Sequence, residues 1–138
     1  KVYQPGTPES EQARKGHVPD AEAVKEMMKY NEQLAEAGIL VSLNGLHPPA
    51  DGVRISFREE SPRVIDGPFT EAKEVVGGYW ILNVKSKEEA IEWARKCPAE
   101  KGDLLELRQI FEMEEFPEEV QKLADNPAVN DAISKGES

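Results

Sequence analysis

The sequence of 138 residues contains one cysteine, Cys97, and only two histidines. A single cysteine excludes an internal disulfide framework and is typical of a chain that folds in a reducing cytoplasm. No zinc-site spacing exists, and we expect neither a metal nor a cofactor. Carboxylates could still hold a hard metal, but with 27 acidic residues chance pairs are common. Cys97 has no neighbouring cation or helix N-terminus to activate it, so we expect an inert thiol.

Positive charge and long apolar runs are also scarce. The chain has 17 Lys and Arg against 27 Asp and Glu, a net charge of −10. Nucleic acids and anionic membranes attract clustered Lys and Arg, so we expect neither as a partner. Apolar runs of only a few residues predict no transmembrane helix and no signal-peptide core. The length, with 38% hydrophobic and 32% charged residues, is typical of one globular domain over residues 1–138.

The first third of the chain predicts a loop, a helix and a strand. Residues 4–19 are rich in Pro, Gly, Glu and Ser and predict a loop, so that residues 1–19 are mostly irregular. A helix is expected over residues 20–37, with Asp20 as N-cap and Gly38 as a left-handed C-cap. A strand over 39–43 and a turn-rich connection over 45–52 follow.

The middle of the chain predicts strands with different faces. Residues 53–58 alternate apolar and polar side chains, which indicates a strand with one wet face, and residues 63–65 are the second arm of a hairpin. Residues 75–84 are apolar on both faces, so both faces should be buried. Gly77 and Gly78 open this strand and not a helix, so they indicate a bulge or a close backbone approach and not a nucleotide loop.

The last third predicts a helix, a long strand and an acidic tail. Ser86 and Glu89 form a capping box for a helix that Pro98 ends. Residues 103–113 alternate and predict a final strand. Residues 114–138 are expected to form a short acidic helix, over 117–123, and a frayed tail.

This order of elements predicts an α+β fold of the ferredoxin-like type, β-α-β-β-α-β, with an antiparallel sheet and helices on one sheet face. The second apolar face of the 75–84 strand then needs a partner, and we expect a homodimer with sheet against sheet. The first strand, "KVY", is short for a central position. Because the chain also lacks an initiator Met, we expect further residues before Lys1.

Several motifs are similar to those of the YCII-related family, in its DGPF-domain branch. They cover roughly residues 20–113: "YNEQLAEAGIL" (30–40), "GLHP" (45–48), "DGPFTEAKE" (66–74), "GGYWILNVKSKEEAIEWARKCP" (77–98) and "ELRQIFE" (106–112). The resemblance implies a bacterial protein that forms a dimeric α/β barrel of ferredoxin-like subunits. Most members have no established function. A His–Asp pair is proposed as catalytic in some, one relative is a lyase on a chlorinated aromatic ring, and DGPF proteins are associated with extracytoplasmic-function sigma factors, which suggests stress physiology.

His47 and Asp66 are the candidate catalytic residues. A histidine side chain titrates near neutral pH and can act as a general base if a carboxylate fixes its tautomer. Asp66 is the natural carboxylate, because its turn could lie near the 45–52 loop. The alternative is structural: a His-Pro-Pro histidine usually faces solvent, and the Asp of Asp-Gly-Pro usually caps backbone N–H groups.

The candidate substrate-binding residues are polar groups around an apolar region. Where other branches carry a histidine on the first helix, this chain has Asn31 and Glu32. They could line a pocket between helix and sheet together with Gln109, or Asn31 could simply tie the helix to the sheet or to the DGPF turn. Glu71 and Lys73 could reach a cleft that Trp80 lines, or form a solvated charge run.

The DGPF turn also has a purely structural interpretation. Gly67 permits a positive φ, Pro68 fixes the next φ, and Phe69 could plug the core.

The sequence leaves two functions open. The first is a homodimer that binds a small organic molecule, with cofactor-free lyase or isomerase chemistry. The second is a non-catalytic binding or regulatory module. A third possibility is a protein–protein interaction through the acidic tail.

Overall fold

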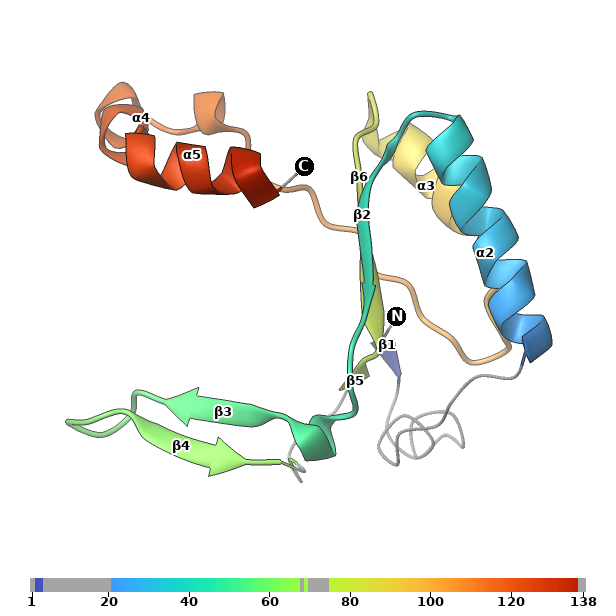
Figure 1. Cartoon of the computed structure of the whole chain (residues 1–138), viewed down its shortest axis with the longest axis horizontal. Coiled ribbons are helices and arrows are strands. Elements are labelled where there is room, and N and C mark those ends of the chain that lie inside the picture. The colour runs from blue at the N-terminus through green and yellow to red at the C-terminus, as the bar shows by residue number, and fades with distance from the viewer. Residues whose placement is uncertain (1, 4–20, 68, 70–74, 137–138) are drawn as a thin grey trace. The chain divides into compact units, whose positions relative to one another are not determined.

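The computed structural model describes residues 2–3, 21–67, 69 and 75–136, which combine helices with antiparallel strands in an α+β structure (Figure 1). The chain divides into two compact units, Lys1–Leu107 and Arg108–Ser138. The expected loop over residues 4–19 and the N-cap Asp20 lie outside the described residues.

The first unit contains most of the regular structure. Its elements are β1 (Val2–Tyr3), α2 (Ala21–Glu36), β2 (Leu40–Gly45), the 3₁₀ turn η1 (Pro49–Asp51), β3 (Val53–Ser56), β4 (Arg63–Asp66), β5 (Val75–Val76), β6 (Gly78–Leu82) and α3 (Lys87–Arg95).

Helix α2 ends as its sequence predicts. Gly38 has a φ of 72°, the left-handed conformation that glycine adopts at little cost. The Gly38 N–H donates to the Ala35 carbonyl at 2.9 Å, and the Ile39 N–H donates to the Leu34 carbonyl at 3.2 Å. These bonds satisfy carbonyl groups that a helix end leaves without partners, so the predicted C-cap is confirmed.

The strands form three antiparallel pairs: β1 with β5, β2 with β6, and β3 with β4. The predicted strand over 75–84 is divided into β5 and β6 at Gly77, whose carbonyl accepts from the Leu46 N–H at 3.0 Å. A Cβ on Gly78 would lie 2.8 Å from the Asn44 carbonyl oxygen. The double glycine therefore marks a close backbone approach, as predicted.

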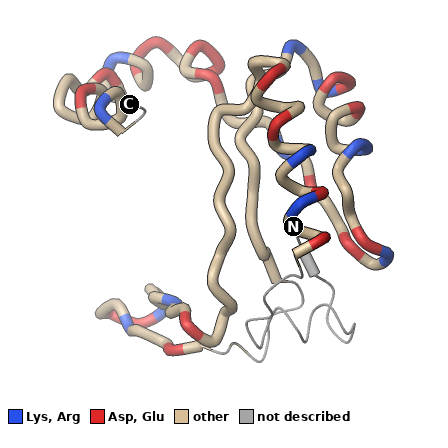
Figure 2. The backbone as a smooth tube through the Cα atoms, turned by 45° about the vertical axis from the view of Figure 1, so that its right-hand side comes forward, with Lys and Arg blue, Asp and Glu red and all other residues tan. Residues whose placement is uncertain are grey.

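The core lies between the two helices and one face of β2–β6. Tyr30, Leu34 and Ile39 are buried at its centre. Around them pack Met27, Leu40, Trp80, Leu82, Val84, Trp93 and Cys97. Figure 1 shows α2 and α3 on the same side of the β2–β6 pair. Figure 2 shows charged residues along both helices and none along these two strands, as packing of one helix face against an uncharged sheet requires.

The opposite face of β2–β6 is open. Tyr79 is 43% exposed and Val41 is 55% exposed. The expectation that both faces of the 75–84 strand are buried is therefore not met within a single chain. Burial of this second face against another copy stays a prediction.

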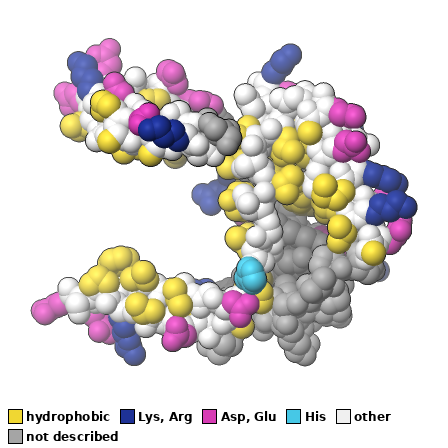
Figure 3. All heavy atoms as spheres, in the orientation of Figure 1, with side chains coloured by type: hydrophobic (Ala, Val, Ile, Leu, Met, Phe, Trp, Pro, Cys, Tyr) yellow, Lys and Arg dark blue, Asp and Glu magenta, His cyan; other side chains and the backbone are white. Residues whose placement is uncertain are grey.

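The β3–β4 hairpin confirms the two predicted arms but leaves its apolar face in solvent. Cross-strand pairing of Ile55 with Val64 and of Val53 with Asp66 places these side chains on one face. Val53, Ile55 and Val64 are each more than half exposed, at 57%, 54% and 62%. Figure 3 shows the apolar side chains of the hairpin gathered on one side.

Gly67 follows β4, and close contact with Pro49, not the predicted positive φ, explains why a glycine is needed there. The positive φ angles found among the described residues belong to Gly38 and Gly102, so the expected positive φ at Gly67 is wrong. A Cβ at this position would instead overlap the Pro49 carbonyl oxygen. The Gly67 N–H donates to the Gly52 carbonyl at 2.9 Å, which extends the β3–β4 pairing by one residue beyond Val53 and Asp66.

Helix α3 begins with the predicted capping residues. The Ser86 hydroxyl accepts from the Glu89 N–H at 3.1 Å. The Glu89 carboxylate reaches back one residue further than expected and accepts from the Lys85 N–H at 2.7 Å. Both bonds occupy N–H groups at the helix start, so the predicted N-terminus is confirmed.

The predicted strand over 103–113 is wrong for most of its length. A single bridge residue occurs at Leu104, and none of the three sheets includes residues 105–112. The end of this segment instead enters the 3₁₀ turn η2 (Met113–Glu115). The Glu115 carboxylate accepts from the Glu112 N–H at 2.7 Å, and the Glu115 N–H donates to the Glu112 carbonyl at 3.0 Å. These local bonds turn the chain where an alternating pattern alone predicts extension.

The second unit, Arg108–Ser138, continues with α4 (Glu118–Ala124) and α5 (Pro127–Gly136). Helix α4 was predicted, but the frayed tail is wrong because α5 occupies it. The Asn126 side-chain oxygen accepts from the Ala128 and Val129 N–H groups at 3.0 and 3.3 Å. With Pro127 at the first helical position, this is a favourable helix N-terminus.

Candidate functional site

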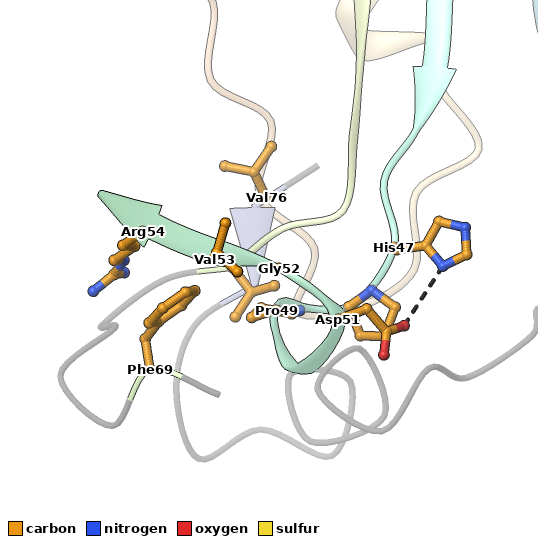
Figure 4. A pocket seen from close by; sticks show the side chains of 10 residues that line it. His47, Pro49, Asp51, Gly52, Val53, Arg54, Phe69 and Val76 are labelled. Atoms are coloured by element: carbon orange, nitrogen blue, oxygen red, sulfur yellow. Dashed lines mark ion pairs between the residues drawn. The ribbon is translucent and has the colours of Figure 1, made fainter. Parts of the chain in front are cut away.

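A pocket of about 360 Å³ lies where the turn after β2, strand β3 and strand β5 meet (Figure 4). Its lining residues are His47, Pro48, Pro49, Asp51, Gly52, Val53, Arg54, Phe69, Val75 and Val76. The pocket therefore combines an apolar wall with three ionisable side chains, which is the usual composition of a site for a small organic molecule.

His47 and Asp51 lie side by side at one side of this pocket. The His47 Nδ1 and Asp51 Oδ2 atoms are 3.5 Å apart. The turn η1 brings the two side chains together, because the Asp51 N–H donates to the Pro48 carbonyl at 3.0 Å and closes the chain on itself. Both side chains are open to solvent, at 91% and 61% exposure. This arrangement leaves Nε2 of the imidazole available to a substrate.

Asp66 is not the carboxylate beside His47 that the sequence predicted. It ends β4, is exposed, and faces Val53 across the hairpin ladder. The carboxylate beside His47 is Asp51, so the predicted His47–Asp66 pair is not formed. The spacing from His47 to Asp51, four residues across a Pro-Pro turn, is the sequence signal that could have identified the partner.

Arg54 and Phe69 form a second pair at the pocket. The Arg54 guanidinium carbon lies 4.0 Å from the centre of the Phe69 ring. Phe69 is half-buried and lies outside the buried cluster of Tyr30, Leu34 and Ile39, so the expected core plug is wrong. The phenyl ring instead supports a cation at the side of the pocket away from His47 (Figure 4).

The apolar wall comes from valines of two strands. Val75 in β5 is only 5% exposed, while Val76 and Val53 present about half of their surface. The β1–β5 pair and the start of β3 therefore both contribute to the wall. Such a wall can bind the carbon skeleton of a ligand through apolar contact.

A second depression, a groove of about 570 Å³, lies between α2 and β2. It contains two predicted binding residues, Asn31 and Glu32, beside Lys25, Met28, Lys29, Ala35, Leu40 and Leu43. Asn31 is 7% exposed, and its side-chain oxygen accepts from the Trp80 indole N–H at 2.8 Å. The prediction that Asn31 ties the helix to the sheet is therefore confirmed, and the groove brings Asn31 and Glu32 together.

Trp80, another predicted binding residue, lines neither depression. Gln109 is exposed and belongs to the second unit. Glu71 and Lys73 lie outside the described residues. Trp80 faces the core and not the His47 pocket. In the core its indole makes an edge-to-face contact with Tyr30, with ring centres 6.1 Å apart.

Tyr30 was not among the predicted functional residues, and its role is structural. Its hydroxyl donates to the Trp93 carbonyl at 2.9 Å, which joins α2 to α3. Burial raises the pKa of Tyr30 from 10.0 to about 12, because the charged phenolate is poorly solvated there.

Among the described residues, no three His, Cys, Asp or Glu side chains gather as a metal site requires. The described helices are also too short or too polar to cross a membrane.

Comparison with known proteins identifies the family. The model of the YCII-related domain matches residues 8–114. The chain is also 28% identical over 76 residues to the uncharacterized protein R00369 of Rhizobium meliloti (strain 1021). That alignment covers 55% of this chain and 61% of the relative's length. Since the domain match spans well over half of the sequence, the chain belongs to the YCII-related domain family.

Proposed function

We propose that this chain is a YCII-related protein of the DGPF branch that binds a small organic molecule in the His47 pocket. There it performs cofactor-free acid–base chemistry of the lyase or isomerase type. His47 is the general base, and Asp51 is its orienting carboxylate. We further propose that it works in the cytoplasm, as a homodimer of ferredoxin-like subunits.

The observation that carries this proposal is the His47–Asp51 pair beside an apolar wall. Asp51 Oδ2 lies 3.5 Å from Nδ1, so in our proposal this carboxylate orients the imidazole with Nε2 toward the ligand. Nε2 can then accept a proton from a carbon or hydroxyl group of a ligand that rests on the valines. Proton transfer by a positioned base accelerates such reactions by about 10²–10⁴-fold.

The pairing of strands supports the ferredoxin-like subunit. The 75–82 segment pairs antiparallel with β2 and, through β5, with β1, as the third strand of a split β-α-β unit does. The open face around Val41 and Tyr79 then needs a cover of at least its own size, and a second sheet supplies one. Val41→Glu should shift sedimentation equilibrium from dimer to monomer while the far-ultraviolet circular dichroism spectrum stays unchanged. A wild-type monomer would contradict this part of the proposal.

Phenylpyruvate provides a direct test of the acid–base chemistry, because its C3 protons are acidic and exchange with deuterated water. Proton NMR should show exchange above the buffer rate with the wild-type protein. His47→Ala should return the rate to that of buffer and leave the melting temperature unchanged, because the imidazole is 91% exposed.

The two aspartates distinguish the proposed partner from its sequence-predicted alternative. Asp51→Asn should slow the exchange, whereas Asp66→Asn, with the same charge change, should leave it at the wild-type rate. If the His47→Ala protein exchanges the C3 protons of phenylpyruvate at the wild-type rate, His47 is not the general base.

A second candidate function is non-catalytic binding, with a regulatory role. The groove between α2 and β2 favours it, because Asn31 and Glu32 line an apolar floor without a histidine. Under this function the protein does not raise phenylpyruvate exchange above the buffer rate, and small-molecule fragments shift the NMR signals of Met28 and Leu43 instead of those of Val53 and Val76. Glu32→Gln should weaken such binding without changing the melting temperature.

A further inference from the structure

Arg54 is the cationic side chain among the residues that line the His47 pocket. It belongs to β3, next to Val53, so the hairpin ladder fixes the position of its backbone. Its guanidinium carbon lies 4.0 Å from the centre of the Phe69 ring. This contact holds the side chain in place without using its N–H donors, which is unlike an ion pair.

The N–H groups of Arg54 are therefore available to a ligand. Arg63 and Arg95 are each within 3.6 Å of a glutamate carboxylate, at 3.6 and 3.5 Å. In the part of the chain that the structure describes, the guanidinium of Arg54 has the ring contact and no carboxylate partner. A planar guanidinium with free donors matches a carboxylate group through two parallel hydrogen bonds.

We propose that the His47 pocket takes a ligand with a planar carboxylate, and that Arg54 binds this group. The inference rests on the proposed function, since it names the class of molecule that the pocket binds. The carboxylate lies at Arg54, the carbon skeleton lies on Val53 and Val76, and the reacting part of the molecule lies toward His47.

The charges at the two sides of the pocket fix this orientation. Figure 4 shows Arg54 and His47 on opposite sides of the valines. Asp51, which pairs with His47, repels a carboxylate from that side, whereas Arg54 attracts it at the other. A chain with a net charge of −10 also repels anions in general, so a carboxylate ligand requires a local cation of this kind.

Benzoate and its neutral counterpart benzamide test the proposal on the full chain. Both are planar and of nearly equal size, so they differ mainly in the charge that Arg54 would recognise. Dissociation constants come from the NMR shifts of the Val53 and Val76 methyl groups. Wild-type protein should bind benzoate about tenfold or more tightly than benzamide, as charge-assisted hydrogen bonds predict.

Variants of two arginines locate the source of this preference. Arg54→Gln should bring the two dissociation constants to near equality. Arg54→Lys, which keeps the charge but loses the planar donors, should give an intermediate ratio. Arg58→Gln is the matched control, because it removes the same charge from an exposed residue that does not line the pocket, and it should keep the wild-type ratio. Urea unfolding of each variant confirms that it is folded.

Equal binding of both probes by the wild type, or a preference that survives in Arg54→Gln, would overturn the role of Arg54 and leave the acid–base proposal intact. Absence of any shift at the valines would also overturn it. Failure of the acid–base proposal is recognised separately, by the absence of His47-dependent exchange of phenylpyruvate.

Discussion

Asn31→Ala should destabilise the first unit more than truncation of an exposed polar side chain on α2. Asn31 is the buried polar side chain among the described residues, and its oxygen accepts from Trp80 Nε1 at 2.8 Å. A hydrogen bond contributes a net of about 0.5–1.5 kcal/mol, and a buried donor left without a partner costs roughly 1–3 kcal/mol. We expect a loss of about 2 kcal/mol in the free energy of unfolding.

Urea unfolding followed by circular dichroism measures this loss, with Gln33→Ala as the matched control. Gln33 lies two residues further along the same helix and is exposed. Its truncation therefore changes helix propensity but removes no buried contact. The midpoint should fall for Asn31→Ala and stay near the wild-type value for Gln33→Ala, with the same slope against urea concentration for both.

A double-mutant cycle isolates the hydrogen bond from other effects of truncation. Trp80→Phe removes the indole N–H, and combining it with Asn31→Ala should cost less than the sum of the single losses, by about 1 kcal/mol. A coupling energy near zero, or equal losses for Asn31→Ala and Gln33→Ala, would refute the view that this bond ties the helix to the sheet.

Three further predictions concern burial, packing and capping. The pKa of Tyr30 is about 12 in the folded state, against 10.0 ordinarily. The neutral hydroxyl of Tyr30 therefore stabilises the fold fully below pH 10, and this contribution is lost as the pH rises toward 12. A titration of tyrosinate absorbance should show a late step that Tyr30→Phe removes. Gly78→Ala should cost about 1–3 kcal/mol through its clash with Asn44, whereas Gly45→Ala, across the ladder with open space, should cost clearly less by urea unfolding. Asn126→Ala should weaken α5 by about 0.5–2 kcal/mol, measured by amide hydrogen exchange at Val129. The absence of a late tyrosinate step would contradict the first prediction. Equal losses of stability for Gly78→Ala and Gly45→Ala would contradict the second, and unchanged amide exchange at Val129 in Asn126→Ala would contradict the third.

Local patterns predicted the elements whose determinants lie within a few residues. The periodicity that ends at Gly38 predicted α2, and Ser86 with Glu89 predicted the start of α3, because caps act over a single turn. The same local reasoning, applied to Asn126 and Pro127, would have found α5.

The site was harder to predict because it depends on contacts between distant segments. Whether a carboxylate reaches His47 depends on how η1 folds, and the turn at Asp-Gly-Pro predicted Asp66 instead of Asp51. The reason for Gly67 is likewise a carbonyl eighteen positions earlier in the chain, at Pro49, which no single-residue conformational preference reveals. Asn31 was the exception, since a polar residue on an apolar helical stripe predicts a buried hydrogen bond by itself.

The Asn31–Trp80 bond also has a consequence for the direction in which α2 presents its side chains. Neighbouring residues on a helix are about 100° apart around its axis, so a helix held only by apolar contacts can rotate slightly with little change in burial. The Asn31–Trp80 hydrogen bond restricts this rotation, because it weakens when donor and acceptor move apart or out of line. Asn31 therefore limits the rotation of α2 about its axis. This keeps Glu32, the next residue, at the groove beside β2.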